Sequence, residues 1–281
     1  MIDLLNFNTI LFDGDGVLWK ADEAIEGIQT LFNFLEEKQI NWALLTNNNT
    51  RTAQNYVDKL IKFGVPADPT RVFTSSTATA AYLLDKYGKG TPLHVVGMDG
   101  LLSTLDEAGF LISTGEQPPN HKVAAVVSGM DRNITHDKIK VAMRLIMSGA
   151  EFVATNTDGS FVTPDGFNPG TGMVIGALQF ASGVEPTVIG KPKNAIFQSA
   201  LKRFGAKPEN TLMVGDRLNT DILGASRLGI STILVLTGVN SREDAANGEV
   251  KPDLILENIN ELLQLLKETF DGPASNSANQ R

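Results

Sequence analysis

The sequence contains no cysteine, and this excludes disulfide bridges, thiolate zinc sites, iron–sulfur clusters and cysteine nucleophiles. Histidine is scarce as well: His94, His121 and His136 are scattered and lack the His-x-x-x-His spacing of a helical metal site. No Gly-x-Ser-x-Gly motif accompanies them, so we interpret all three as surface residues or hydrogen-bonded loop residues. If the chain is an enzyme, its expected reagents are carboxylates, lysine and a hard cation.

Long hydrophobic runs are also absent, since no apolar stretch reaches the ~18 residues of a membrane span. Residues 1–10 carry no basic segment ahead of an apolar one, so we expect no secretory signal, no membrane partner and a cytoplasmic location. The net charge of −8 and the pI of about 5.0 disfavour a nucleic-acid polymer as partner, because an acidic surface repels its phosphates.

The chain has 281 residues, enough for about two domains of ~150 residues or for one domain with a large insertion. Apolar runs predict strands at 8–12, 42–45, 72–74, 94–97, 123–128, 151–155, 187–189, 211–214, 232–236 and 254–256. Helical spacing of apolar residues predicts helices at 28–35, 53–61, 78–84, 136–147, 196–204 and 259–270, and after Gly170. This alternation predicts an α/β fold with a Rossmann-like parallel sheet and helices on both faces.

Polar residues follow four of these predicted strands directly. They are Asp13-Gly14-Asp15, Thr46-Asn47-Asn48-Asn49, Gly190-Lys191-Pro192 and Gly215-Asp216, with Asp221 at the start of the next helix. Ligands of parallel sheets bind at the carboxyl ends of the strands, so we expect these residues to share one pocket. Each motif alone is typical of a turn, a loop or a helix cap; their joint position after four strands favours a catalytic site.

The chemistry of such a pocket follows from its residue types. Two carboxylates ~4 Å apart repel by about 4 kcal/mol at an effective dielectric of 20, so the cluster needs a cation, and oxygen ligands without histidine or cysteine indicate Mg²⁺. Asp13 can bind the metal and attack phosphorus, and Asp15 can face the leaving group. Thr46 and the Asn47 amide can donate to phosphate oxygens, and Lys191 can neutralise their charge.

At these residues the sequence resembles the haloacid dehalogenase (HAD) superfamily of aspartate-nucleophile phosphatases. The motifs are ILFDGDGVLW, LLTNNNT, IGKPK and MVGDRLNTD, in the order of the family. The separation of Thr46 from Lys191 leaves room for a large cap, as in 4-nitrophenyl phosphatases, phosphoglycolate and pyridoxal phosphate phosphatases, and bacterial nucleotide and sugar-phosphate phosphatases. The resemblance implies a HAD-like hydrolase core at 1–90 and 187–270, with an inserted α/β cap at 91–186. The Ser/Asn/Gly-rich tail at 271–281 is predicted to be disordered.

The resemblance also implies a role for each site residue. Asp13 would be the nucleophile that forms an aspartyl-phosphate, and Asp15 would protonate the leaving oxygen and then activate water. The implied ligands of Mg²⁺ are Asp13, the backbone carbonyl of Asp15 and Asp216, with Asp221 supporting the metal or Lys191. Phosphate would be bound by Thr46, Asn47 and Asn48. Gly14 stands at a position that varies in the family, and its effect on substrate choice is open.

The cap poses questions that the sequence leaves open. The loop 155–158 and the segment 170–172 either overhang the site and screen substrates or only build the cap. Relatives that hydrolyse pyridoxal phosphate carry a histidine about where Phe161 falls here, which disfavours that substrate. Caps of this kind pair subunits in relatives, so the resemblance implies a homodimer.

The function expected from the motifs is Mg²⁺-dependent hydrolysis of the phosphomonoesters of small metabolites. Two alternatives stay open: a catalytically idle regulatory or binding protein on the same scaffold, and a phosphotransferase or protein phosphatase. A large cap disfavours bulky protein substrates. Phosphoglycolate, sugar phosphates, nucleotides and pyridoxal phosphate are not distinguished by the sequence.

Overall fold

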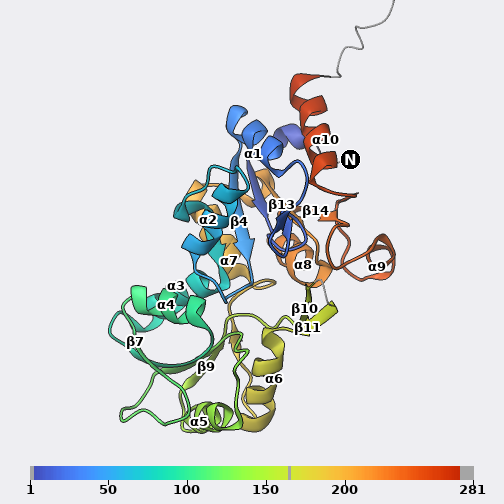
Figure 1. The fold of residues 1–281 in the computed structure, drawn as a ribbon. Coiled ribbons are helices and arrows are strands. Elements are labelled where there is room, and N and C mark those ends of the chain that lie inside the picture. The colour runs from blue at the N-terminus through green and yellow to red at the C-terminus, as the bar shows by residue number, and fades with distance from the viewer. Residues whose placement is uncertain (1–2, 164–165, 273–281) are drawn as a thin grey trace, which may run out of the picture.

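A computed structural model describes residues 3–163 and 166–272 and contains two parallel β-sheets, one above the other in Figure 1. The larger sheet has six strands in the order β15-β14-β13-β1-β4-β5, and every neighbouring pair is parallel. Its strands are β1 (Thr9–Phe12), β4 (Asn41–Thr46), β5 (Val72–Thr74), β13 (Thr211–Gly215), β14 (Ser231–Val235) and β15 (Leu254–Leu256).

Both faces of the larger sheet are buried, because successive side chains of a strand point to opposite faces and here both kinds are apolar. Ile10 and Phe12 of β1 pack in one hydrophobic cluster under α1 (Ile28–Glu37), α2 (Ala53–Lys62) and α10 (Ile259–Asp271). Leu11 packs in a second cluster under α3 (Ser75–Tyr87), α7 (Asn194–Phe204) and α8 (Leu223–Ser226). The α/β, Rossmann-like fold expected from the sequence is confirmed.

The smaller sheet has five parallel strands in the order β12-β9-β8-β6-β7. They are β6 (Pro92–Val96), β7 (Leu111–Thr114), β8 (Ala125–Ser128), β9 (Glu151–Ala154) and β12 (Thr187–Val188). The helices α5 (His136–Met147) and α6 (Thr171–Ser182) cover one face. On the other face, Leu93 and Val127 join the cluster that contains Leu11 and α4 (Asp99–Glu107), so the apolar interior is continuous between the sheets.

One strand assignment from the sequence is corrected. We placed the strand at 187–189 with the core, but β12 pairs with β9, with Thr187 opposite Val153, and therefore completes the smaller sheet. Asp271, expected in the tail, is the last residue of α10. The rest of the predicted disordered tail, from 273 on, lies outside the described residues. The division into a core and a cap at 91–186 stays a prediction.

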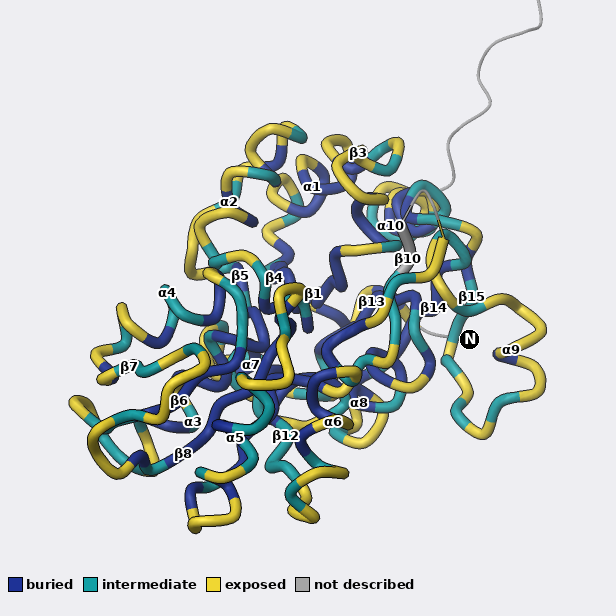
Figure 2. Tube along the Cα trace, turned by 60° about the horizontal axis from the view of Figure 1, so that its bottom comes forward, coloured by how far each residue is buried: buried dark blue, intermediate teal, exposed yellow. Residues whose placement is uncertain are grey.

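Short elements without a clear hydrophobic period were missed by the sequence. They include the hairpin β2 (Trp19–Lys20) and β3 (Glu23–Ala24), the hairpin β10 (Ser160–Thr163) and β11 (Gly166–Pro169), α4, β7, and α9 (Arg242–Asn247). Figure 2 shows why some were hard to find: α9 is largely exposed and β7 is exposed or half-buried, whereas β1, β13 and β8 are buried throughout. No helix among the described residues is both long and apolar enough to cross a membrane.

Candidate active site

The carboxyl ends of three adjacent strands bring the predicted motifs to one edge of the larger sheet. Asp13 follows β1, Thr46 ends β4 and Asp216 follows β13, and β1 lies between the other two strands. The backbone N–H of Asp13 still donates to Val214, 2.9 Å away, so the nucleophile candidate is anchored by the sheet itself. Lys191 reaches the same place from the smaller sheet, just after β12.

Lys191 is the positive centre of the site. Its Nζ lies 2.5 Å from Asp13 Oδ1 and 2.7 Å from Asp221 Oδ1, and it donates a 2.9 Å hydrogen bond to the carbonyl of Leu45. These partners occupy all three ammonium protons of a side chain that is 2% exposed. Burial opposes its charge, but the two carboxylates outweigh burial and raise the pKa of Lys191.

Three buried carboxylates lie around this lysine. One oxygen from each of Asp13, Asp216 and Asp221 lies within 4.8 Å of the others. Burial, followed by the charge of Asp221, raises the pKa of Asp216 to about 7. Burial also raises the pKa of Asp13 well above its usual value, although Lys191 opposes that rise. Three carboxylates against one lysine leave negative charge that a divalent cation would offset.

Asp216 supplies an independent test of whether these residues fit a metal ion. Its Oδ2 accepts a 2.8 Å hydrogen bond from the backbone N–H of Val239, but its Oδ1 is buried and no donor within residues 3–163 and 166–272 reaches it. Gly238 permits this approach, because a Cβ there would lie 1.9 Å from Oδ2. An unpartnered buried carboxylate oxygen, in an all-oxygen donor set, fits a hard divalent cation.

Asp15 lies beside this cluster without joining it. Its side chain is exposed to the site cavity, and its Oδ1 accepts a 3.0 Å hydrogen bond from Nε1 of Trp19. Gly14 separates Asp13 from Asp15 and allows this contact, because a Cβ on Gly14 would lie 2.4 Å from Cζ2 of the Trp19 ring. Gly14 therefore makes room for the buried indole.

The second motif divides into groups that face the cavity and groups that hold loops in place. Thr46 Oγ1 accepts a 3.1 Å bond from the Asn48 backbone, which leaves its own hydroxyl proton to donate. The Asn47 side chain is fully engaged: its Oδ1 accepts from the Lys191 backbone N–H at 2.8 Å and its Nδ2 donates to the Lys191 carbonyl at 2.9 Å. The Asn48 side chain closes a turn by accepting from the N–H and hydroxyl of Thr50.

Sequence reasoning missed how strongly this motif is tied to the smaller sheet. Asn49 is buried, donates to the hydroxyls of Thr155 (3.0 Å) and Thr171 (3.2 Å), and accepts from the Met130 backbone at 2.8 Å. Nδ2 of Asn47 also donates to Asp158, whose two carboxylate oxygens each lie 3.2 Å away. The available signal was a run of three asparagines after an apolar strand, which indicates side-chain hydrogen bonding but not its partners.

A cavity of about 870 Å³ opens over these groups, between the two sheets. Its lining includes Asp13, Asp15, Thr46, Lys191 and Asp216. Residues between β8 and β12 complete it: Arg132, Asn156, Asp158, Phe161, Gly170 and Thr171. Burial raises the pKa of Asp158, and the positive charges of Arg217 and Lys191 oppose that rise. From the loop at 155–158 and the segment at 170–172, four residues line the cavity: Asn156, Asp158, Gly170 and Thr171. Thr155 and Thr171 also bond to Asn49, so these segments both build the structure and line the site.

Comparison with known proteins agrees with this geometry. The family model described as haloacid dehalogenase-like hydrolase matches residues 10–111, and a second model of HAD-like hydrolases matches 188–262. The chain is 33% identical to an acid sugar phosphatase of Staphylococcus epidermidis over 91% of this chain and 96% of that protein, and 35% identical to a 5'-nucleotidase of Bacillus subtilis over 89% and 95%.

A solved structure extends the likeness to three dimensions. The 4-nitrophenylphosphatase of Thermotoga maritima superposes with a TM-score of 0.86 at 31% identity, covering 94% of this chain and 99% of that one. The matches span both sheets and all four motifs. The chain therefore belongs to the haloacid dehalogenase-like hydrolases and is a phosphoric monoester hydrolase that acts on small phosphorylated metabolites.

Proposed function

We propose that this hydrolase is Mg²⁺-dependent and works through an aspartyl-phosphate on Asp13. The observation that carries the proposal is the buried cluster of Asp13, Asp216 and Asp221 around Lys191, with Oδ1 of Asp216 unpartnered among the described residues. Asp13, the carbonyl of Asp15 and Asp216 would hold the ion. When bound, Mg²⁺ neutralises the carboxylates and draws the phosphoryl oxygens toward them.

In the first step, a carboxylate oxygen of Asp13 forms a bond to phosphorus while the bond from phosphorus to the leaving oxygen breaks. Asp15 transfers its proton to that leaving oxygen, which departs as a neutral alcohol. In the second step, Asp15 removes a proton from water, the water oxygen attacks phosphorus, and the bond to Asp13 breaks. Inorganic phosphate leaves, Asp13 is again a carboxylate and Asp15 again carries its proton.

The phosphoryl oxygens would be held by the Thr46 hydroxyl and by the backbone N–H of Asn47, with the Lys191 ammonium beside them. The backbone N–H of Asn48, expected from the sequence to bind phosphate, instead donates to Thr46 Oγ1 and would orient that hydroxyl. The setting of Lys191 suits it to stabilise the phosphoryl group. Its ammonium group is buried and held by Asp13 and Asp221, so it needs no reorganisation when negative charge develops on the phosphoryl oxygens. Asp221 acts through Lys191 and through the backbone N–H of Arg217, which donates to its Oδ2 at 3.1 Å.

The substrate class is a sugar phosphate, a nucleotide or a similarly small phosphomonoester. A volume of about 870 Å³ lies in the range of small-molecule sites, and Asp158 and Phe161 of the proposed cap line the cavity. A large cap over the site disfavours a folded protein substrate. Residues 91–186 would act as the cap that selects among these substrates. A panel of phosphorylated metabolites ranked by kcat/KM identifies the preferred one.

Hydrolysis of 4-nitrophenyl phosphate with and without Mg²⁺ tests the proposal most simply. We expect metal-dependent turnover in the unmodified enzyme and a loss of at least about 10³-fold in Asp13→Asn, because no other residue replaces the nucleophile. Asp106→Asn on α4, an exposed carboxylate outside the site, is the matched control and should keep full activity. Turnover that persists in Asp13→Asn, with a native circular dichroism spectrum, would refute the nucleophile assignment.

The alternative functions predict different results. An idle binding protein would bind phosphate without turnover, and a phosphotransferase would deliver phosphoryl to an added alcohol faster than to water. The presence of Asp13, Asp15, Thr46, Lys191 and Asp216 in one cavity supports hydrolysis over an idle site.

A homodimer through the cap stays a proposal, and α6 offers the surface that supports it. Its outer face carries Met173, Phe180 and, just beyond it, Val184, and the Phe180 side chain is 94% exposed. Gly176 and Ala177 between them add no charge, so the face can pack against a copy of itself. Light scattering should give a dimer that Phe180→Glu converts to a monomer; a monomeric wild type would contradict the proposal. The cytoplasmic location also stays a prediction.

A further inference from the structure

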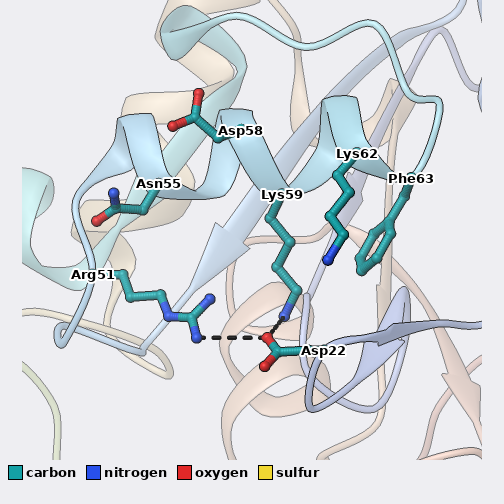
Figure 3. Close-up of a pocket in the computed structure, with 7 residues that line it drawn as sticks. All are labelled: Asp22, Arg51, Asn55, Asp58, Lys59, Lys62 and Phe63. Carbon is teal, nitrogen blue, oxygen red and sulfur yellow. Dashed lines mark ion pairs between the residues drawn. The ribbon is translucent and has the colours of Figure 1, made fainter.

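Lys59 of α2 is held against the β2–β3 hairpin, at the rim of the site cavity. Its Nζ donates a 2.5 Å hydrogen bond to the carbonyl of Ala21 and lies 3.8 Å from Oδ1 of Asp22, and the side chain is 10% exposed. Figure 3 shows Lys59 pointing from the helix to Asp22, which Arg51 also approaches, to 3.6 Å. Ala21 adopts a positive φ of 49°, so the hairpin turn needs such an anchor.

The same ammonium group lies over the ring of Trp19. Nζ is 4.4 Å from the ring centroid, a distance at which a cation is attracted to the electron-rich face of an indole. Tyr56 and Phe63 of the same helix region also contact this ring, with centroids 6.1 Å and 6.2 Å away. Trp19 is fully buried, and its orientation is therefore set by side chains spaced three and four residues apart around α2.

Trp19 in turn fixes Asp15, because its Nε1 donates a 3.0 Å hydrogen bond to Oδ1. With Oδ1 accepting from the indole, Oδ2 is the oxygen that would carry the proton for the leaving group. Burial lowers the pKa of Lys59 and the charge of Asp15 opposes that shift, which places the two groups within electrostatic reach of each other. A cation over the ring also polarises the indole and strengthens its N–H as a donor.

We propose that Lys59 is a positioning residue for catalysis: it holds Trp19 and the 19–24 hairpin so that the indole N–H orients the carboxyl group of Asp15 toward the leaving oxygen. The inference rests on the proposed function, in which Asp15 is the acid and base. It assigns a purpose to Gly14 as well, since a side chain there would push the indole away.

A positioning role differs from a merely structural one in its dependence on the leaving group. The 4-nitrophenolate ion departs readily without a proton, whereas an alkoxide requires one from Asp15. Misplacing Asp15 should therefore slow hydrolysis of alkyl phosphates much more than hydrolysis of 4-nitrophenyl phosphate. Loss of packing alone would slow both substrates equally.

The test compares Lys59→Met with Lys59→Arg on two substrates: 4-nitrophenyl phosphate, and the alkyl phosphate that the unmodified enzyme hydrolyses fastest. We expect Lys59→Met to lower kcat for the alkyl phosphate on the order of tenfold and kcat for 4-nitrophenyl phosphate less than about threefold. Lys59→Arg keeps a cation over the ring and should recover most of the loss. Lys62→Met, on the same helix and drawn beside Lys59 in Figure 3, is the matched control and should leave both rates unchanged.

Trp19→Phe provides a second, independent variant, which keeps an aromatic ring and removes the Nε1–H donor. It should show the same preference for the better leaving group, and Lys59→Met should add little to it, because both act on Asp15 along one path. Equal losses on both substrates, or fully additive losses in the double variant, would overturn the inference.

Failure of the proposed function gives a different pattern. Asp15→Asn should lower alkyl phosphate turnover by about 10² or more if Asp15 is the acid. If Asp15→Asn stays active on the alkyl phosphate, the proposed mechanism is wrong. If Asp15→Asn is impaired and Lys59→Met is not, only the role of Lys59 is wrong.

Discussion

Replacing Asp216 by asparagine should change how the stability of the metal-free enzyme depends on pH. The folded state raises the pKa of Asp216 from 3.8 to about 7, chiefly through burial and then through the charge of Asp221. Between these two values the folded protein binds a proton that the unfolded chain has released. Stability from this group is therefore present below about pH 4 and is lost as the pH rises toward 7.

The size of the loss follows from the shift. One pKa unit corresponds to about 1.4 kcal/mol, so the rise from 3.8 to about 7 amounts to about 4 kcal/mol, of which about 2 kcal/mol falls between pH 5 and 7 because the folded group is half ionised at pH 7. Asparagine does not titrate, so Asp216→Asn should lack this slope. Every other titrating group is shared by the two proteins, so the difference between them reports Asp216 together with its charge interaction with Asp13 and Asp221.

The assay is urea unfolding of both proteins in chelator at several pH values from 5 to 8, repeated with excess Mg²⁺. In chelator, the free energy of unfolding of the wild type should fall with pH relative to that of the variant. Mg²⁺ should restore the wild type at neutral pH and leave the variant nearly unchanged, because the ion binds the folded carboxylate cluster. A difference between the proteins that is flat with pH in chelator would refute the account of the cluster.

Three further predictions test other parts of the structure. Lys191→Met should lower the free energy of unfolding by about 3–5 kcal/mol in chelator, because it strands two buried carboxylates; urea unfolding measures this, and a loss below about 1 kcal/mol would contradict it. Asn49→Ala should cost about 2 kcal/mol and lower kcat/KM, since it removes three bonds to the smaller sheet; unchanged stability and kinetics would count against the link. His94, expected on the surface or in a loop, is buried in β6, and burial lowers its pKa to about 4. From pH 6.5 to 4 the free energy of unfolding of the wild type should therefore fall by about 3 kcal/mol relative to that of His94→Gln, and a difference that stays constant with pH would exclude this role of His94.

The larger sheet and the position of the site residues were predictable because the local sequence of each strand indicates a buried strand. The run ending at Phe12 and the run ending at Leu45 are apolar on both faces, which is typical of buried parallel strands, and a polar residue follows each. The carboxyl ends of such strands share an edge, so the neighbourhood of Asp13, Thr46 and Asp216 needed no knowledge of distant contacts.

Lys191 lies beside Asp13, as the sequence predicted, but it follows a different sheet from the one expected. The sequence suggested that it follows a strand of the larger sheet, whereas β12 pairs with β9 of the smaller one. A two-residue strand has no hydrophobic period that could reveal its partner, and pairing is decided by register over the whole sheet. The lysine reaches Asp13 because the two sheets meet there.

The contacts between sheets were beyond sequence reasoning for a related reason. Asn49 meets Thr155 and Thr171 across more than a hundred positions, and a single polar residue carries no signal for such a partner. The β2–β3 hairpin and its contact with Lys59 were missed because the turn at Ala21 lacks glycine or proline.

The most direct measurement of the central claim is to locate the phosphoryl group during turnover. Asp15→Asn should form the aspartyl-phosphate and hydrolyse it slowly, because the base for the second step is gone. Rapid acid quench, proteolysis and mass spectrometry should then find phosphate on the peptide that contains Asp13, and Asp13→Asn should abolish it. A phosphorylated residue elsewhere, or turnover of 4-nitrophenyl phosphate with no phosphopeptide in Asp15→Asn, would contradict the account.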